Sequence, residues 1–272
     1  MSAAFHNQIS VLIRFSYPAA SGFRAAREGV DQARRLLYDP ARLARRFRLF
    51  ETLALPSLLA QSARDFTTIV LIGEDMPATA RTRLQALLAP LHGARIVALP
   101  PLPMFGATRR AYDAALDPHA THLTSVRLDD DDAISTDLVA RLKAMVPGAV
   151  ALMGAQEPLV ISHQNGLFAE IAPSGNRVYG VVERSPLGIG LAMVAPVGRR
   201  DTIFSRNHRL LGQFYGCLSD AVIPAFIRTV HRDNDAEPHA SGQVFDLSDA
   251  QADTLLQTRF ATTLDALRAL PA

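Results

Sequence analysis

The chain is poor in cysteine, in lysine and in long apolar runs. Cys217 is the only cysteine of the 272 residues, which excludes an intrachain disulfide framework and a cysteine-based metal site. Lys143 is the only lysine, so nearly all of the basic side chains are arginines, which can bind phosphate through two parallel hydrogen bonds. No run approaches the roughly 20 apolar residues that a membrane-spanning helix needs. We therefore expect no transmembrane segment and a reducing compartment, the cytoplasm.

Other absences narrow the class of protein further. The first apolar run, 9–15, is short and contains Arg14, which is not typical of a secretory signal. The 28 basic and 26 acidic residues are too balanced to indicate a nucleic-acid partner. Hydrophobic residues make up 49% of the chain, so it can build a sizeable core and is not globally disordered. Attachment to the surface of a membrane is compatible with this composition.

Strand-like and helix-like segments alternate along the first half of the chain. Apolar runs predict strands at 8–16, 66–73, 94–99 and 122–128. Apolar residues at helical spacing predict helices at 47–61, 79–91 and 105–116, and we expect Pro56 to kink or break the first of them. An arginine-rich stretch, 24–48, is expected to be partly helical and broken near Asp39-Pro40. Ser135 is expected to cap a helix at 136–145. This alternation predicts an α/β domain with a mostly parallel central sheet.

The second half has a mixed pattern. Apolar runs at 149–162, 166–172 and 177–182 predict strands, and turn-forming residues separate them. The segment 219–230 is compatible with a helix or a strand. We expect a helix pair or one long helix at 249–270.

Four consecutive aspartates, Asp129 to Asp132, follow the fourth predicted strand. Adjacent carboxylates repel one another and are costly to desolvate, so such a run either lies in solvent or surrounds a cation. Parallel sheets bind ligands at the carboxyl ends of their strands, where this run is expected. Carboxylate oxygens suit Mg²⁺ or Mn²⁺, which often accompany phosphate-bearing substrates. The competing interpretation is a solvated helix N-terminus, a position that acidic side chains favour.

Basic residues near the predicted strand ends have two interpretations each. Arg14 could contact a ligand or form a structural ion pair, and Arg127 could bind phosphate or neutralise the aspartates. The arginine cluster at 24–48 could bind an anionic acceptor or lipid headgroups, or it could form a solvated helical face.

Several short motifs occur in an order that is similar to a known family. They are LFETLALPSLLAQ at 49–61, the acidic turn GEDMP at 73–77, RLDDDDA at 127–133, and a late H-x-x-N from His231 to Asn234. Together they resemble the bacterial putative rhamnosyltransferase family, within the family-2-like glycosyltransferases of the A-type fold. The resemblance implies a single Rossmann-like A-type glycosyltransferase domain over 1–272. Its nucleotide-binding half would be 1–134, and its acceptor half with the C-terminal helices would be 135–272.

The resemblance also implies a reaction. Such enzymes move a sugar, which the resemblance implies is rhamnose here, from a dTDP- or UDP-sugar to a hydroxyl of a glycan or small-molecule acceptor, with inversion and with Mn²⁺ or Mg²⁺. By analogy with the family's Asp-x-Asp motif, Asp129 and Asp130 would bind the nucleotide sugar and Asp131 would bind the metal. Because the four aspartates are consecutive, the motif could instead begin at Asp130 and end at Asp132. His231 would be a second metal ligand or, alternatively, a phosphate ligand. The remaining donor-binding residues would be Arg14, Glu74 and Arg127.

The resemblance implies that the base that deprotonates the acceptor is an acidic residue at the start of a helix in the second half. Asp220 fits that position best, with Glu183 and Asp201 as rivals, and His208 is a weaker candidate for acceptor binding. Two other functions stay open: a metal-dependent phosphohydrolase or nucleotidyltransferase, and a non-catalytic nucleotide-sugar-binding module.

Overall fold

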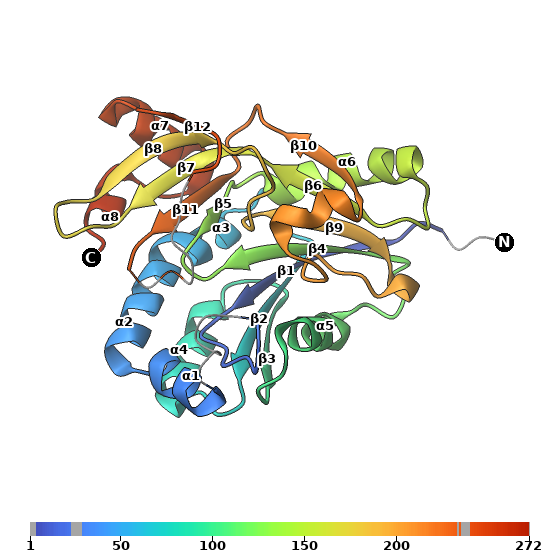
Figure 1. The fold of residues 1–272 in the computed structure, drawn as a ribbon, viewed down its shortest axis with the longest axis horizontal. Helices are drawn as coiled ribbons and strands as arrows, with labels where there is room; N and C mark the ends of the chain where they lie inside the picture. Colours follow the sequence, from blue (N-terminus) through green and yellow to red (C-terminus); the bar gives the residue numbers. More distant parts are fainter. Residues whose placement is uncertain (1–3, 23–28, 233, 235–239, 272) are drawn as a thin grey trace.

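Two β-sheets organise the chain in the computed structural model, which describes residues 4–22, 29–232, 234 and 240–271 (Figure 1). The larger sheet has seven strands in the order β10-β6-β9-β4-β1-β2-β3, and the smaller has five in the order β12-β8-β7-β11-β5. The α/β class with a mostly parallel central sheet, expected from the sequence, is confirmed. Among the described residues, no helix is both long enough and apolar enough to cross a membrane.

The parallel part of the larger sheet comes from the first half of the chain. Its strands are β1 (Asn7–Arg14), β2 (Thr67–Gly73), β3 (Ala94–Leu99) and β4 (His122–Asp129), and all pair in parallel. Helices α2 (Pro40–Leu49), α3 (Leu55–Leu59) and α4 (Ala78–Leu88) pack with one face, and α5 (Met104–Ala115) covers the other. Burial on both faces explains why these strands are nearly continuous apolar runs.

The helices before β2 differ in part from the prediction. The expected break at Asp39-Pro40 is confirmed, because α1 (Val30–Leu37) ends before it and the Asp39 side chain accepts the Arg42 N–H at 2.8 Å to cap α2. The expected break at Pro56 is absent. A π-helical turn, η2 (Phe50–Ala54), runs directly from α2 into α3, so the helix continues through Pro56 and its irregular turn lies just before this residue.

The segment after β4 corrects another prediction. Residues 149–153 belong to α6 (Leu138–Met153) rather than to a strand, and Asp137, not Ser135, is the residue before its first turn. Burial of Leu142, Val146 and Val150 follows helical spacing. A short apolar run does not distinguish a buried helix from a strand by periodicity alone, which is why the sequence was misleading here.

The larger sheet is completed by strands from the second half. β9 (Leu191–Pro196) pairs antiparallel with both β4 and β6 (Leu159–His163), and β10 (Gly216–Asp220) pairs in parallel with β6 at the edge. Two short 3₁₀ helices, η3 (Val197–Arg199) and η4 (His208–Gln213), connect β9 to β10. The carboxyl ends of β4, β6 and β10 therefore lie at the same edge of the sheet.

The smaller sheet carries the C-terminal helices. Its strands are β5 (Ala133–Ile134), β7 (Asn165–Glu170), β8 (Arg177–Val182), β11 (Phe226–Val230) and β12 (Gln243–Phe245). The strands predicted at 166–172 and 177–182 pair antiparallel as β7 and β8, and the C-terminal segment forms a helix pair, α7 (Asp249–Phe260) and α8 (Leu264–Arg268), rather than one long helix. Both helices pack on β7 and β11 through a second apolar cluster.

Gln61 explains the role of the SLLAQ sequence in this fold. Its side chain is buried, and its Nε2 donates to the carbonyl oxygens of Ser57 and Ser135, both at 2.8 Å. Its Oε1 accepts the N–H of Val139 at 3.0 Å. One side chain thus joins the end of α3 to the segment after the aspartates and to the first turn of α6.

We expect Gln61→Met to lower the free energy of unfolding by about 2–3 kcal/mol, because one buried N–H and two buried carbonyl oxygens lose the side chain that they bond. Urea denaturation measures the loss. Gln85→Met, at an exposed position of α4, should change stability by less than about 0.5 kcal/mol. Equal stability of the two variants would contradict the structural role of Gln61.

Candidate functional site

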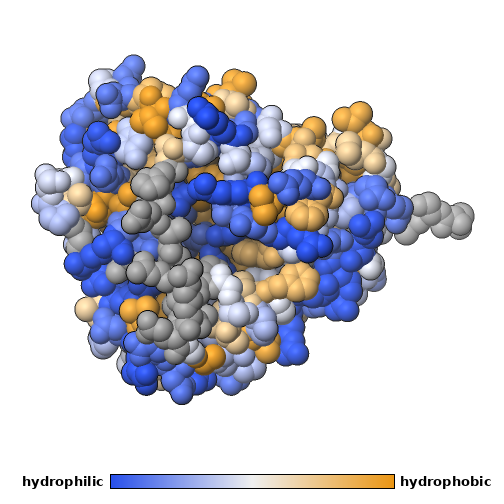
Figure 2. Space-filling model, viewed as in Figure 1, coloured by the Kyte–Doolittle hydropathy of each residue, from blue (hydrophilic) through white to orange (hydrophobic). Residues whose placement is uncertain are grey.

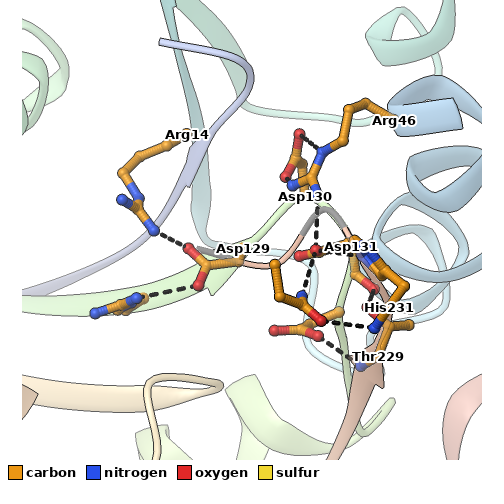
Figure 3. Close-up of polar contacts among 10 residues, drawn as sticks. Arg14, Arg46, Asp129, Asp130, Asp131, Thr229 and His231 are labelled. Carbon is orange, nitrogen blue, oxygen red and sulfur yellow. Dashed lines mark hydrogen bonds and ion pairs between the residues drawn. The ribbon is translucent and has the colours of Figure 1, made fainter. Parts of the chain in front are cut away.

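The four aspartates occupy the carboxyl end of β4 and the turn that leads to β5 (Figure 3). Asp129 is the last residue of β4, and Asp132 directly precedes β5. The exposed fractions of Asp130, Asp131 and Asp132 are only 1%, 5% and 5%. The solvated helix N-terminus is therefore the wrong interpretation, because three carboxylates are buried and α6 begins only at Leu138.

Asp129 lies between two arginines. The parallel register of β1 and β4 places Arg14 beside it, and these two side chains form an ion pair. The Nη2 of Arg127 lies 3.0 Å from the second carboxylate oxygen. Burial alone would raise the pKa of Asp129, but the guanidinium groups of Arg127 and Arg14 hold it well below its ordinary value. Asp129 is therefore ionised and neutralised, which is the structural role considered for Arg127.

Arg46, on α2, neutralises the next two aspartates from the other side (Figure 3). Its Nε donates to Asp130 Oδ2 at 3.1 Å and its Nη1 to Asp131 Oδ2 at 2.7 Å, and a third bond joins Nη2 to Asp130 Oδ1. Only 9% of Arg46 is exposed. The interpretation of the arginine cluster as a solvated helical face is therefore wrong for Arg46. Arg24 and Arg27 of that cluster lie outside the described residues.

The sequence alone indicates that Arg46 is buried, although the other described arginines of the cluster are at least partly exposed. Leu43, Phe47 and Phe50 of the same helical segment are buried. Arg46 falls within this apolar stripe at helical spacing, whereas a solvated arginine would lie on the opposite face. A guanidinium in a buried stripe needs a buried anion as its partner.

Asp131 and His231 are brought together across the two sheets. His231 follows β11, and its Nε2 lies 3.0 Å from Asp131 Oδ2. Asn234 of the H-x-x-N motif donates from Nδ2 to the same carboxylate oxygen at 3.4 Å and accepts the His231 backbone N–H at 2.7 Å. Burial opposes ionisation of Asp131, but Arg46 and His231 lower its pKa below the ordinary value. The H-x-x-N motif thus positions an imidazole against an ionised carboxylate.

Asp132 has a different environment from its neighbours. Its Oδ1 accepts the Thr229 backbone N–H at 2.9 Å, and the Thr229 hydroxyl donates to the carbonyl oxygen of Asp131 at 2.9 Å. Burial and the negative charges of Asp131 and Asp129 raise the pKa of Asp132 well above its ordinary value. Asp132 thus fastens the aspartate turn to β11, and it favours the protonated form, which is a poor metal ligand.

The described residues offer two candidate ligands for a divalent cation. Among them, no three His, Cys, Asp or Glu side chains form a group that could hold a metal ion. Asp131 and His231 do converge at hydrogen-bond distance. Mg²⁺ in particular is often bound through one or two carboxylates, with water and substrate phosphates completing the shell. The donor set fits such an ion with open positions, although the Arg46 guanidinium would compete for Asp131.

The remaining candidates lie apart from the aspartates. Glu74 is exposed just beyond the carboxyl end of β2, and its backbone N–H donates to the Leu99 carbonyl at 3.0 Å. Asp220 is the last residue of β10 and not the start of a helix, because the chain is extended there and pairs with β6. Its carboxylate pairs with Arg141 and accepts the Val222 N–H at 2.8 Å. Strands β9 and β6 separate it from β4.

The three rivals for a role in acceptor chemistry are also placed by the structure. Glu183 is buried and accepts the Ser241 N–H at 3.0 Å, and Asp201 accepts the Tyr215 hydroxyl at 3.0 Å. His208 begins η4. Burial, followed by the positive charge of Arg127, lowers the pKa of His208 to about 3, so its imidazole is neutral at physiological pH.

The face of the molecule in Figure 2 shows a hollow near its centre, bordered largely by hydrophilic residues. It lies close to where Figure 1 draws the carboxyl ends of β1 and β4. The aspartates, with Arg14 and Arg127, come from these strand ends. Their position agrees with the rule that α/β sheets bind ligands at this edge.

Comparison with solved structures gives distant similarities. S. aureus TarS, residues 1–349, in complex with UDP-GlcNAc, is 10% identical with a TM-score of 0.45, and the match covers 84% of this chain and 60% of the TarS chain. A protein from Desulfovibrio desulfuricans G20 described as a "putative nucleotide-diphospho-sugar transferase" is 12% identical with a TM-score of 0.36, with 86% and 83% of the two chains covered. No curated protein matches the sequence.

The family model described as "putative rhamnosyl transferase" matches residues 8–243. This range contains β1, all four aspartates, Arg46 and His231, and it ends in β12. It includes every residue of the site described above and most of the chain. The protein therefore belongs to the putative rhamnosyl transferase family.

Proposed function

We propose that this protein is a metal-dependent, inverting glycosyltransferase that transfers a sugar, rhamnose, from a nucleotide-diphosphate donor to a hydroxyl group of a glycan or small-molecule acceptor. The observation that carries the proposal is the Asp131–His231 pair, 3.0 Å apart at the carboxyl end of β4. Family membership supports the class of reaction. The expected donor is a dTDP- or UDP-sugar.

Asp131 and His231 would hold Mn²⁺ or Mg²⁺, which supplies a Lewis acid for the negative charge of the diphosphate leaving group. Arg46 holds Asp130 and Asp131 in place through three hydrogen bonds, which fix the orientation of both carboxylates. Arg14 and Arg127 fix Asp129 from both sides. We assign Asp129 and Asp130, with these two arginines, to donor binding.

Glu74 is the proposed contact to the nucleoside. It is exposed at the carboxyl end of β2, the neighbour of β1 in the sheet, so that its carboxylate can reach a ligand lying over these strand ends. A carboxylate at this position can accept hydrogen bonds from ribose hydroxyls or from the base.

Asp220 is the proposed base for the acceptor hydroxyl. It lies at the same edge of the sheet as Asp129, because β10, β6 and β4 run in the same direction. Burial disfavours its charge, but the Val222 N–H and Arg141 lower its pKa, which keeps the carboxylate ionised at neutral pH. An ionised carboxylate can accept a proton, although the lowered pKa reduces its strength as a base.

We expect Asp220→Asn to lower kcat about 100-fold while nucleoside-diphosphate binding is unchanged, because the variant keeps the shape of the side chain but cannot accept the proton. Initial rates of sugar transfer and binding of UDP measure the two quantities. Glu183→Gln and Asp201→Asn are the matched comparisons. If one of them loses transfer while Asp220→Asn retains it, the base is that residue and not Asp220.

The melting temperature tests the function itself. Nucleoside diphosphates and nucleotide sugars are screened with Mn²⁺, with Mg²⁺ and with a chelator, because a ligand that binds only the folded state raises the melting temperature. We expect an increase with dTDP or UDP that is larger when metal is present. If no nucleoside diphosphate shifts the melting temperature, the proposal is wrong. Phosphate release from simple esters without an acceptor would favour a phosphohydrolase instead.

A further inference from the structure

A pocket beside the aspartates is lined by three arginines, and none of its described lining residues is an aspartate or a glutamate. The empty space between its walls, open solvent included, is about 310 Å³. The pocket is formed by α2, the end of β7, the residues after β11 and the segment after α8, and its lining residues are Arg45, Arg48, Leu49, Ile171, His231, Arg232 and Pro271.

Helix α2 directs arginine side chains both toward the pocket and toward the aspartates. Arg45 and Arg48 are three residues apart, so they lie on the same face of α2 and both reach the pocket. Arg46, between them, is directed to Asp130 and Asp131 instead. Within the described part of the chain, Arg48 and Arg232 make no ion pair with a carboxylate, whereas Arg46 makes two. The described lining of the pocket therefore carries more positive than negative charge.

The apolar part of the lining strengthens this attraction. Leu49 and Ile171 are buried residues of the pocket wall. A charge beside apolar side chains is less screened than one surrounded by water, so an anion is attracted more strongly there than on an open surface. Arginine also matches the geometry of phosphate oxygens, because its guanidinium can donate two parallel hydrogen bonds.

His231 connects the pocket to the aspartates. It lines the pocket and also lies 3.0 Å from Asp131. An anion in the pocket is therefore next to the proposed metal position. We propose that this pocket binds a phosphate group of a substrate through Arg48 and Arg232, with Arg45 beside them. The proposal deepens the proposed function, on which it rests for the identity of the substrate, and names an anionic group that the arginines recognise.

Isothermal titration calorimetry with inorganic pyrophosphate tests the pocket directly. We expect Arg48→Gln and Arg232→Gln each to weaken pyrophosphate binding about tenfold, since a charge-assisted hydrogen bond to phosphate is lost. Both arginines are exposed, so their replacement should not alter the melting temperature. Arg81→Gln, on the exposed face of α4, is the matched control and should bind pyrophosphate as the wild type does. Arg48→Lys, which keeps the charge, should recover part of the affinity.

Two further ligands identify the source of the phosphate. If UDP binding also falls in Arg48→Gln and Arg232→Gln, the pocket takes the diphosphate of the donor. If UDP binding is unchanged but glycerol 3-phosphate binding falls, the pocket takes a phosphate of the acceptor. Both results support the pocket. Wild-type affinity for pyrophosphate and glycerol 3-phosphate in both variants, or no binding of either to the wild type, overturns it. Pyrophosphate binding without metal-enhanced UDP or dTDP binding would instead contradict the proposed transferase and leave the pocket standing.

Discussion

Replacing Asp131 with asparagine should lower the rate of sugar transfer about 1,000-fold. Asp131 provides an ionised carboxylate against His231, and its pKa is held below the ordinary value by Arg46 and His231 despite burial. Asparagine keeps the volume but removes the negative charge that a divalent cation needs. Loss of one preorganised electrostatic group in an active site typically costs two to three orders of magnitude in kcat. Initial transfer rates at saturating donor measure the effect.

A second measurement on Asp131→Asn separates metal binding from folding. The increase in melting temperature that Mn²⁺ adds to a nucleoside diphosphate should disappear, whereas the metal-free effect of the nucleotide should persist. Asp113→Asn, an exposed carboxylate on α5, is the control and should behave as the wild type does. If Asp131→Asn retains both full activity and the metal-dependent increase, Asp131 is not a metal ligand.

Replacing Arg46 with methionine should lower the free energy of unfolding by about 3–5 kcal/mol, which is the usual cost of leaving a buried charge without its partner. Asp130 and Asp131 would each lose the guanidinium that neutralises them. Both carboxylates are at most 5% exposed, so water cannot replace it. Methionine retains much of the apolar stem of arginine. The decrease in the free energy of unfolding therefore measures the lost charge rather than lost packing. Guanidinium chloride denaturation measures it.

Arg48→Met is the matched control for stability. It lies two residues further along α2 and is exposed, so its replacement should change the free energy of unfolding by less than about 0.5 kcal/mol. Arg46→Lys should fall between the two, because lysine keeps the charge but cannot donate to both aspartates in the same geometry. If Arg46→Met is as stable as Arg48→Met, Arg46 does not neutralise buried carboxylates in solution.

The sequence by itself determined the arrangement of the first half. Buried parallel strands require continuous apolar runs, and the four runs that were predicted correspond to β1, β2, β3 and β4. The direction of a parallel strand follows from that of its neighbours, so residues after β4 must lie at the carboxyl edge of the sheet. The position of the four aspartates at a ligand-binding edge therefore followed from local pattern alone.

The secondary structure of the second half was less predictable, because its helices and strands depend on contacts with segments that are distant in the sequence. Residues 149–153 could equally be buried in a helix or a strand, and packing against the sheet made them the end of α6. Asp220 became the end of an edge strand because residues 216–220 pair with β6, an interaction with a segment more than 50 residues earlier in the chain. No local signal specifies such a partner.

Only the tertiary structure decided what each aspartate contacts. Four identical neighbouring residues are equivalent in sequence, but apart from Arg127 on β4 itself the partners named here come from β1, α2, β11 and the residue after β11, which are 84 to 115 residues away along the chain. Arg14 and Arg127 hold Asp129, Arg46 holds Asp130, His231 faces Asp131, and the Thr229 backbone binds Asp132. The sequence placed a carboxylate cluster at the site; the fold made Asp131 the one that is ionised beside an imidazole, because charge and burial depend on neighbours in space.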